Sequence, residues 1–351
     1  MHARLASRAT RRLSHTTALL VRAVCALLSA RVASLTAQQP AERPAWCAKL
    51  PRPAYATLPR VTVPSDWFEV YRVDPDVYAI YEPHQWQEVI SYLIVGRERA
   101  LLFDTGMGIA EIGPVVSALT DRPIVVLNSH SHHDHVGGNH AFTRVLALDL
   151  PYTRDHARGS QHAEVAGEIA PSALCGALPA GFDTATYRIR PWRVTGIVHD
   201  GSRIDLGGRS LEVLRVPGHA LDAIALRDEA HGLLFTGDTF YEGPIYVFGA
   251  GADFGEYTRS VERLAALAPA PRKLLTAHNV AASDPQLLPA LRDAVRAIAS
   301  GAAAGTRDSA LVTYTFDAFS IQLPARRPPA GQERHLGFSD QTTVAGRRRG
   351  R

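Results

Sequence analysis

Hydrophobic and polar positions alternate with a period of two over several short stretches near the start of the chain. Such alternation, in runs rich in β-branched and aromatic residues, predicts strands with a buried face. The predicted strands of this first series are residues 68–73, 77–81, 89–95, 100–103 and 124–127. Helical spacing predicts a helix over residues 109–119, and a polar helix rich in His and Glu is predicted over residues 155–169.

A second series of strands follows the polar helix. Its members are residues 192–198, 203–206, 211–216, 223–226, 233–235 and 274–276, with a closing strand over residues 311–323. Apolar residues at helical spacing predict helices over residues 254–267 and 285–298. Strands in bursts followed by helices, twice along one chain, suit two sheets packed face to face with helices outside. We therefore predict an α/β protein.

Composition supports a globular protein of this size. The chain has 351 residues, of which 46% are hydrophobic and 21% charged, with three cysteines. Disordered chains contain fewer apolar residues, and small disulfide scaffolds contain far more cysteines. A chain of this length can bury a sizeable core without covalent links.

The charge is concentrated at the two ends. Residues 1–37 and 325–351 hold 13 of the 38 basic residues but only 2 of the 34 acidic ones. The body between them is therefore acidic, which argues against nucleic acid as a partner. No run reaches the roughly 18 apolar residues that a membrane span needs, so we expect no stable span in the mature chain.

The ends also suggest how the chain is divided. Residues 1–37 resemble a signal or targeting segment, because they are rich in Arg, contain no acid and include an interrupted apolar run. We expect a mature chain that begins near Gln38 and is exported to the periplasm or secreted, with a cytoplasmic location as the alternative. A Pro-rich linker (residues 38–65), a catalytic domain (66–323) and a disordered basic tail (324–351) would follow. In an oxidising compartment Cys47 and Cys175 could pair.

The strongest chemical signal lies after the strand predicted at residues 124–127. Four side chains in six positions carry metal-binding groups: His130, His132, Asp134 and His135. Imidazole and carboxylate groups suit borderline metals such as zinc, and a loop lets closely spaced ligands converge. The pattern therefore predicts a metal site.

Three more candidate ligands end or follow later apolar strands. They are His219 in Pro-Gly-His, Asp238 in Thr-Gly-Asp and His278 in Leu-Thr-Ala-His. Strand ends deliver side chains to a shared rim, and the glycines permit tight turns beside them. Taken singly each residue is more often part of a turn, but their number and order favour one common site.

With these motifs, and with Asp104-Thr105-Gly106 upstream, the chain resembles the metallo-β-lactamase superfamily over residues 66–300. The resemblance implies a four-layer αββα sandwich with two metal ions, zinc or alternatively iron or manganese. It implies that one metal binds His130, His132 and His219, that the other binds Asp134, His135 and His278, and that Asp238 bridges both. Asp104 is expected to hold a ligand His or the metal-site loop, and His133 to lie outside the ligand set.

The resemblance implies hydrolysis of a small-molecule substrate by metal-activated water. Asp134 would orient the water or accept its proton, and Tyr241 could donate to the oxyanion or leaving group, or simply anchor its loop. The bridging Asp238 favours an ester, thioester or lactone carbonyl, since dedicated β-lactamases commonly place Cys or Ser there. A β-lactam hydrolase, an iron persulfide dioxygenase and a metal-binding protein without turnover stay as alternatives.

The expected substrate pocket is aromatic. The loop at residues 81–86 lies where this fold commonly has a mobile cover over the substrate, and it ends on Trp86. Tyr246 and Phe248 follow the bridging carboxylate. Aromatic walls would suit an acyl chain or a ring, although the same residues could only pack loops onto the sandwich.

Overall fold

The fold is described from a computed structural model, of which residues 43–325 are described here. The predicted targeting segment, the first residues of the predicted linker and the basic tail beyond residue 325 lie outside these residues. Between residues 43 and 325, no helix is long and apolar enough to cross a membrane.

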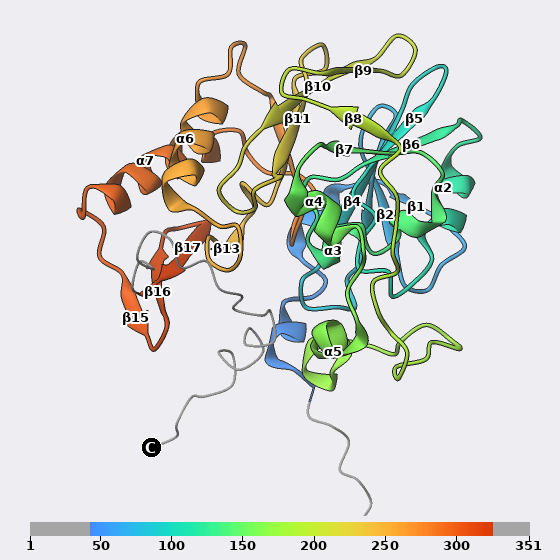
Figure 1. The fold of residues 1–351 in the computed structure, drawn as a ribbon, viewed down its shortest axis with the longest axis horizontal. Coiled ribbons are helices and arrows are strands. Elements are labelled where there is room, and N and C mark those ends of the chain that lie inside the picture. The colour runs from blue at the N-terminus through green and yellow to red at the C-terminus, as the bar shows by residue number, and fades with distance from the viewer. Residues whose placement is uncertain (1–42, 326–351) are drawn as a thin grey trace, which may run out of the picture. The chain divides into compact units, whose positions relative to one another are not determined.

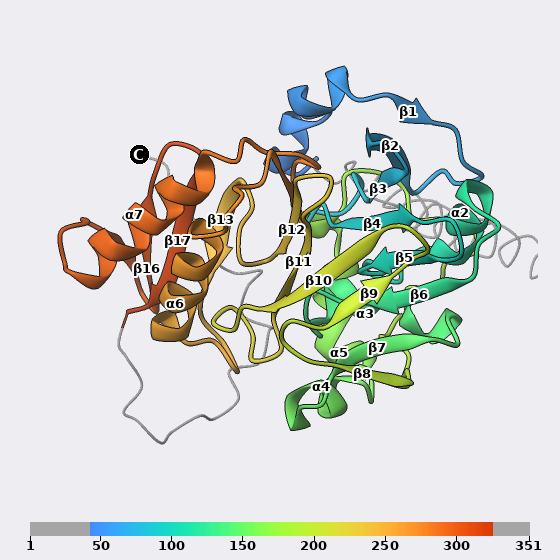
Figure 2. The same cartoon turned by 90° about the horizontal axis from the view of Figure 1, so that it is seen from above.

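The first sheet has eight strands in the order of the chain, as Figure 2 shows. They are β1 (Arg60–Val61), β2 (Glu69–Asp74), β3 (Val77–Tyr81), β4 (Ile90–Val95), β5 (Ala100–Phe103), β6 (Ile124–Leu127), β7 (Val145–Leu148) and β8 (Gly196–Val198). Strands β1 to β5 pair in antiparallel fashion, and β5 to β8 pair in parallel.

The second sheet has five strands in the order β14-β12-β11-β10-β9. They are β9 (Arg203–Asp205), β10 (Ser210–Arg215), β11 (Ile224–Asp228), β12 (Leu233–Gly237) and β14 (Lys273–Thr276). A smaller sheet of order β13-β17-β16-β15 lies beside the C-terminal helices (Figure 1). Its strands are β13 (Gly243–Tyr246), β15 (Thr306–Asp308), β16 (Leu311–Thr315) and β17 (Phe319–Pro324).

The helices differ greatly in length. The three longest are α2 (Ile112–Leu119), α6 (Phe254–Ala265) and α7 (Leu287–Ala299). Short helices lie in the loops: α3 (His133–Val136), α4 (Pro151–His156) and α5 (His162–Val165). Single 3₁₀ turns are η1 (Ala45–Lys49), η2 (Pro53–Thr57), η3 (Asn139–Ala141), η4 (Ala166–Ile169) and η5 (Pro171–Ala173).

Three apolar cores separate four layers. The first lies between the two large sheets, where Phe103 of β5 meets Phe235 of β12 edge to face. The second lies between the first sheet and α2. The third lies between the second sheet and α6 and α7. Figure 2 shows α6 and α7 on one side and α2 on the other, with the two sheets between them. The predicted αββα sandwich is confirmed.

The strand predictions at residues 77–81, 100–103 and 124–127 coincide with β3, β5 and β6. The helix predicted at residues 155–169 is wrong. The chain instead forms α4, α5 and η4, because Gly159 has a φ of +78° and a Cβ there would lie 2.1 Å from the Ile189 carbonyl oxygen. The strand predicted at residues 311–323 is also wrong as one element, since it folds back on itself as the β16–β17 hairpin.

The strand predicted at residues 192–198 is shorter than expected. Only β8 pairs with β7, while Trp192 packs into the second core from an irregular segment. Four strands were not predicted at all: β1, β7, β13 and β15.

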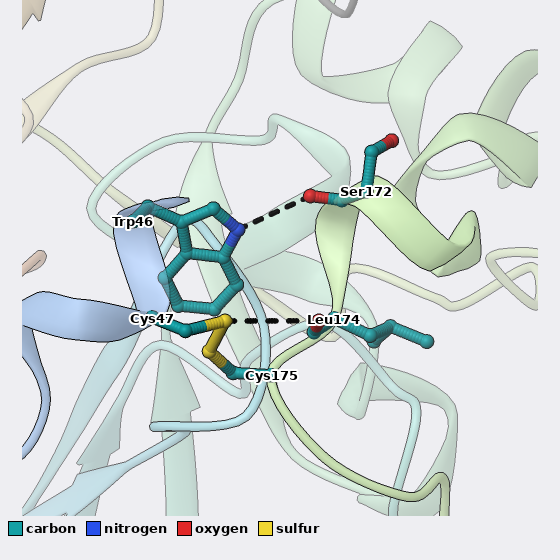
Figure 3. The surroundings of a disulfide bond; sticks show 5 residues. All are labelled: Trp46, Cys47, Ser172, Leu174 and Cys175. Carbon is teal, nitrogen blue, oxygen red and sulfur yellow. Dashed lines mark hydrogen bonds between the residues drawn. A yellow bond between two sulfur atoms is a disulfide. The ribbon is translucent and has the colours of Figure 1, made fainter. Parts of the chain in front are cut away.

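The described part of the predicted linker, residues 43–65, is structured and packs onto the domain. Cys47 and Cys175 form a disulfide with a Cα–Cα distance of 5.5 Å, as Figure 3 shows. Tyr55 is buried and stacks on Tyr81 with ring centroids 4.4 Å apart. Proline-rich sequence here favours 3₁₀ turns and an edge strand over a free linker.

Candidate metal centre

The predicted ligands all follow the carboxyl ends of strands in the two large sheets. His130 follows β6, His219 follows β10, Asp238 follows β12 and His278 follows β14. His132 caps the start of α3, which carries Asp134 and His135. All seven side chains are buried, so their polar atoms require partners.

Two glycines allow the chain to turn where ligands are presented. Gly218, before His219, has a φ of +136°, and a Cβ on it would lie 2.2 Å from Tyr257 Cα. Gly237, before Asp238, has a φ of +52°, and a Cβ there would lie 2.6 Å from Ser129 Cβ. Only glycine fits both the backbone angle and the close approach at these positions.

The first donor group consists of His130, His132 and His219. Their nitrogens lie close together: His130 Nε2 is 2.9 Å from His132 Nδ1, which is 3.0 Å from His219 Nε2. These are the residues that the sequence assigned to one metal, and their donor atoms could hold one ion.

The second donor group consists of Asp134, His135 and His278. Asp134 Oδ2 lies 3.2 Å from His135 Nε2 and 3.7 Å from His278 Nε2. Their donor atoms could hold an ion as well.

Asp238 lies between the two groups. Its Oδ1 is 3.3 Å from His135 Nε2 and 3.0 Å from His278 Nε2, both in the second group. Its Oδ2 is 3.5 Å from His219 Nε2 in the first group and 3.2 Å from His278 Nε2 in the second. The Asp238 carboxylate therefore lies within 3.5 Å of nitrogens from both donor groups, as a bridging ligand requires.

The spacing of these atoms is compatible with metal coordination. Ligand atoms about 2.0–2.1 Å from one tetrahedral zinc ion lie about 3.3 Å from one another. Moreover, His135 Nε2 and Asp238 Oδ1 are buried and make no hydrogen bond within residues 43–325. Buried donors and acceptors seldom go unpaired, so convergence without hydrogen bonds points to a cation between them.

The second nitrogen of each imidazole contacts a group outside the cluster. His278 Nδ1 donates to the Gln87 carbonyl at 2.7 Å and His219 Nδ1 to the Tyr246 carbonyl at 2.6 Å. The other contacts are His135 Nδ1 with Asp104 Oδ2 at 3.0 Å, His130 Nδ1 with Ser129 Oγ at 3.0 Å and His132 Nε2 with the Tyr152 hydroxyl at 3.0 Å. Such contacts fix the ring orientation, and the other nitrogen of each ring lies within its donor group.

Comparison with known proteins agrees with this geometry. The sequence pattern of the metallo-beta-lactamase superfamily matches residues 86–278, more than half of the chain. This chain belongs to the metallo-beta-lactamase superfamily.

Curated relatives within the superfamily include thioester hydrolases. The acyl-coenzyme A thioesterase MBLAC2 of Bos taurus is 29% identical over 185 residues, 49% of this chain and 66% of that protein. A hydroxyacylglutathione hydrolase of Methylococcus capsulatus is 34% identical over 174 residues, 48% of this chain and 55% of that protein. The chain thus spans just under two thirds, or less, of these relatives. A solved metallo-beta-lactamase from Pontibacter korlensis has 20% identity, a TM-score of 0.47 and coverage of 65% of this chain and 99% of its own.

Burial and neighbouring charges shift the pKa values of the candidate ligands. Burial, together with neighbouring imidazoles, lowers the pKa of His130 and His132 well below the usual value, which keeps them neutral. Burial would raise the pKa of Asp238, but His278 and His135 hold it well below the usual range. Burial would lower the pKa of His135 and His278, but neighbouring carboxylates raise both. Neutral imidazoles and ionised carboxylates are the forms that bind metals, so His130, His132 and Asp238 are already in those forms.

Asp104 and His133 lie outside the donor groups. Asp104 accepts a hydrogen bond from the Ser129 backbone N–H at 2.6 Å as well as from His135, the contact that holding a ligand His requires. His133 Nε2 lies 3.3 Å from Glu168 Oε1. The Glu168 carboxylate also accepts from Trp86 Nε1 at 3.0 Å.

The expected pocket residues take different positions. Tyr241 is buried, and its hydroxyl donates to the Pro244 carbonyl, so it anchors its own loop. Tyr246 and Phe248 are half-buried, with ring centroids 5.5 Å apart, and burial with nearby Asp238 raises the pKa of Tyr246 to about 12. Trp86 is also half-buried.

The loop at residues 81–86 is hydrogen-bonded to a later segment. Its Gln85 is fully buried and donates to Glu168 Oε2 at 2.9 Å, while the Trp86 backbone N–H donates to the Ala173 carbonyl at 2.9 Å. These contacts join the loop to residues 168–175, and we call the loop the wall.

Sequence reasoning missed three residues that support the centre. Tyr152 contacts His132, and Glu168 ties the wall to α3. Asp222 accepts from the Thr153 hydroxyl at 2.8 Å and from the Ser131 backbone at 3.4 Å, which ties the loop after His219 to the His-rich loop. Of the three, Asp222 is the one near a predicted ligand in the sequence, three residues after His219.

Proposed function

We propose that this protein is a metal-dependent hydrolase with two metal ions, acting on a thioester or related ester carbonyl. The observation that carries the proposal is the pair of donor groups with the Asp238 carboxylate between them, 3.5 Å from His219 Nε2 and 3.0 Å from His278 Nε2. The curated relatives with thioesterase and hydroxyacylglutathione hydrolase names support the substrate class.

Zinc is the metal we propose, with iron or manganese as alternatives. The first donor group offers three imidazoles, and the second offers two imidazoles and a carboxylate, with Asp238 shared. When bound, such a metal pair lowers the pKa of water toward neutrality and polarises a carbonyl oxygen.

The chain's own residues would orient the reactants. His135 and His278 hold the pKa of Asp134 well below its usual value, although burial alone would raise it, so the carboxylate is ionised. An ionised Asp134 can align the attacking water and take its proton. The water oxygen then bonds to the acyl carbon, the carbon–sulfur bond breaks, and the thiolate leaving group takes up a proton.

Apolar surface near the first donor group supports an acyl substrate. Leu221, two residues after His219, is 41% exposed, which is unusual for a large apolar side chain in this protein. A Cβ on Gly251 would lie 3.3 Å from Leu221 Cγ and 2.9 Å from the Tyr152 ring. Three segments thus meet in one apolar rim beside His132, which would suit an acyl chain.

Export is part of the proposal. The disulfide between Cys47 and Cys175 is typical of proteins that fold in oxidising compartments. Sequencing the N-terminus of protein made by its native host tests this: a mature chain beginning near Gln38 is expected, and a full-length cytosolic product would contradict export.

A substrate panel tests the reaction. Zinc-loaded protein should hydrolyse acyl-coenzyme A or glutathione thioesters with a higher kcat/KM than a lactone, a bis-aryl phosphodiester or a chromogenic cephalosporin. A preference for the cephalosporin would favour the β-lactam hydrolase instead. Oxygen consumption with a persulfide substrate and an iron-loaded protein would favour the dioxygenase.

A further inference from the structure

The segment before β2 is linked to residues 171–175 by a disulfide and a hydrogen bond. We call residues 44–58 the N-terminal strap. The disulfide joins Cys47 to Cys175, and the Trp46 indole donates to the Ser172 carbonyl at 3.1 Å (Figure 3). Two independent links therefore hold the strap to the segment at residues 171–175.

The strap carries one cation into this region. Arg52 donates from Nε and Nη2 to the two carboxylate oxygens of Glu88, at 2.6 Å each. Its Nη2 also donates to Asn279 Oδ1 at 2.6 Å. A bidentate pair of this kind fixes geometry as well as charge, which a lysine could not reproduce.

Both partners of Arg52 have an unusual backbone. Glu88 has a φ of +48° and Asn279 a φ of +67°, in the left-handed region that residues other than glycine seldom adopt. Both side chains are buried, with 2% and 8% of their surface exposed. Such conformations persist only where surrounding contacts hold them, and Arg52 contacts both residues at once.

These two residues flank the groups that orient His278. Gln87, directly before Glu88, supplies the carbonyl that accepts from His278 Nδ1 at 2.7 Å. Asn279 directly follows His278, and its backbone N–H donates to the Glu88 carbonyl at 3.2 Å. Arg52 thus connects the segment that carries His278 to the segment whose Gln87 carbonyl orients the His278 ring.

We propose that Arg52 is a positioning residue for His278, and that the Cys47–Cys175 disulfide keeps it in place. The inference rests on the proposed two-metal function. According to this proposal, the metal held by the second donor group depends on a segment outside the matched region, residues 86–278. The hydrogen bonds of the Arg52 side chain go to Glu88 and Asn279, which flank Gln87 and His278 in the sequence.

A chelator competition with zinc-loaded, full-length protein tests this. Wild type, Arg52→Ala and Arg52→Lys would be compared, with Glu88→Gln as a second way to weaken the pair if Arg52→Ala folds poorly. Arg296→Ala is the matched control, because Arg296 makes the same bidentate contact with Glu262, 2.6 Å to each oxygen, on the surface between α6 and α7. Unfolding of the metal-free forms would be measured in parallel.

Arg52→Ala and Glu88→Gln should weaken zinc binding at one of the two sites by about 10- to 100-fold, the usual effect of losing a residue that orients a ligand. Arg52→Lys should recover part of the loss, and Arg296→Ala should show none. The double variant Cys47→Ser/Cys175→Ser should shift the same site in the same direction, by less.

Zinc affinities equal to wild type in both Arg52→Ala and Glu88→Gln would overturn the positioning role. So would parallel loss at both sites together with destabilised metal-free protein, since that pattern indicates a general effect on folding. An unchanged double cysteine variant would overturn the part assigned to the disulfide. A wild type that binds fewer than two zinc ions would instead contradict the proposed function itself.

Discussion

Replacing Asp104 by Asn is the sharpest test of how the centre is held together. Asp104 is 1% exposed and accepts two hydrogen bonds, one from the Ser129 backbone N–H at 2.6 Å and one from His135 Nδ1 at 3.0 Å. Its backbone has a φ of +68°, which Asn tolerates, so the substitution changes the chemistry without new backbone strain.

The expected loss of stability and zinc affinity follows from these two hydrogen bonds. The amide of Asn has one oxygen, so it can accept from Ser129 or from His135 but not from both through separate oxygens as the carboxylate does. Either way one buried donor loses its partner, which costs about 1–3 kcal/mol. If His135 loses its hydrogen bond, zinc affinity should fall by about 10- to 100-fold, because the imidazole of His135 is no longer held in the orientation that binds the metal.

Chelator competition and denaturant unfolding of the same variant would separate these effects. Asp228→Asn is the matched control: Asp228 is 0% exposed and contacts Arg209 at 2.6 Å and His231 at 2.8 Å, at the end of β11 away from the centre. The control should lose stability but bind zinc normally. An Asp104→Asn variant that matches wild type in both stability and zinc affinity would refute the reasoning.

Three further predictions concern single residues. Asp238→Ala should lower turnover by orders of magnitude while the protein still folds, because the shared carboxylate is lost; near-normal turnover at full metal content would count against a bridging role. Trp86→Ala should raise KM more than it lowers kcat, with Trp86→Phe closer to wild type, since the wall would contribute binding common to ground and transition states; a pure kcat effect would contradict this. Burial, with nearby Asp134, raises the pKa of Glu82 to about 7. Protonated Glu82 therefore stabilises the folded protein fully below about pH 4.5. This stabilisation, up to about 3 kcal/mol, is lost as the pH rises through about 7. Urea unfolding of the metal-free protein from pH 5 to 8 should show wild type losing more stability than Glu82→Gln, and equal slopes would contradict the assignment.

The sequence predicted the strands best where short β-branched runs are bounded by turn residues. Prediction from the sequence failed where the local conformation depends on contacts with distant parts of the chain. Gly159 breaks the predicted polar helix because its turn packs against the Ile189 carbonyl, a contact that no local pattern encodes. Likewise β13 pairs with β17, which lies much later in the chain, so the run Gly243–Tyr246 shows no strand signal of its own.

The candidate ligands could be predicted because their chemistry is unusual in sequence. Side chains that hold a metal must be His, Asp, Glu or Cys, and clusters of these are rare by chance. The groups that orient the ligands could not be predicted in the same way. Two of them are backbone carbonyls, of Gln87 and Tyr246, and every residue carries one. Arg52 was missed because its segment reads as a Pro-rich linker.

The metal content of the full-length protein tests the central claim most directly. Inductively coupled plasma mass spectrometry on wild type, prepared without chelators, should find about two zinc ions per chain, as a dinuclear hydrolase requires. His219→Ala and His278→Ala remove one ligand from each donor group, and each should retain about one zinc ion per chain. A wild type with a single iron ion, or one that binds no metal tightly, would contradict the account.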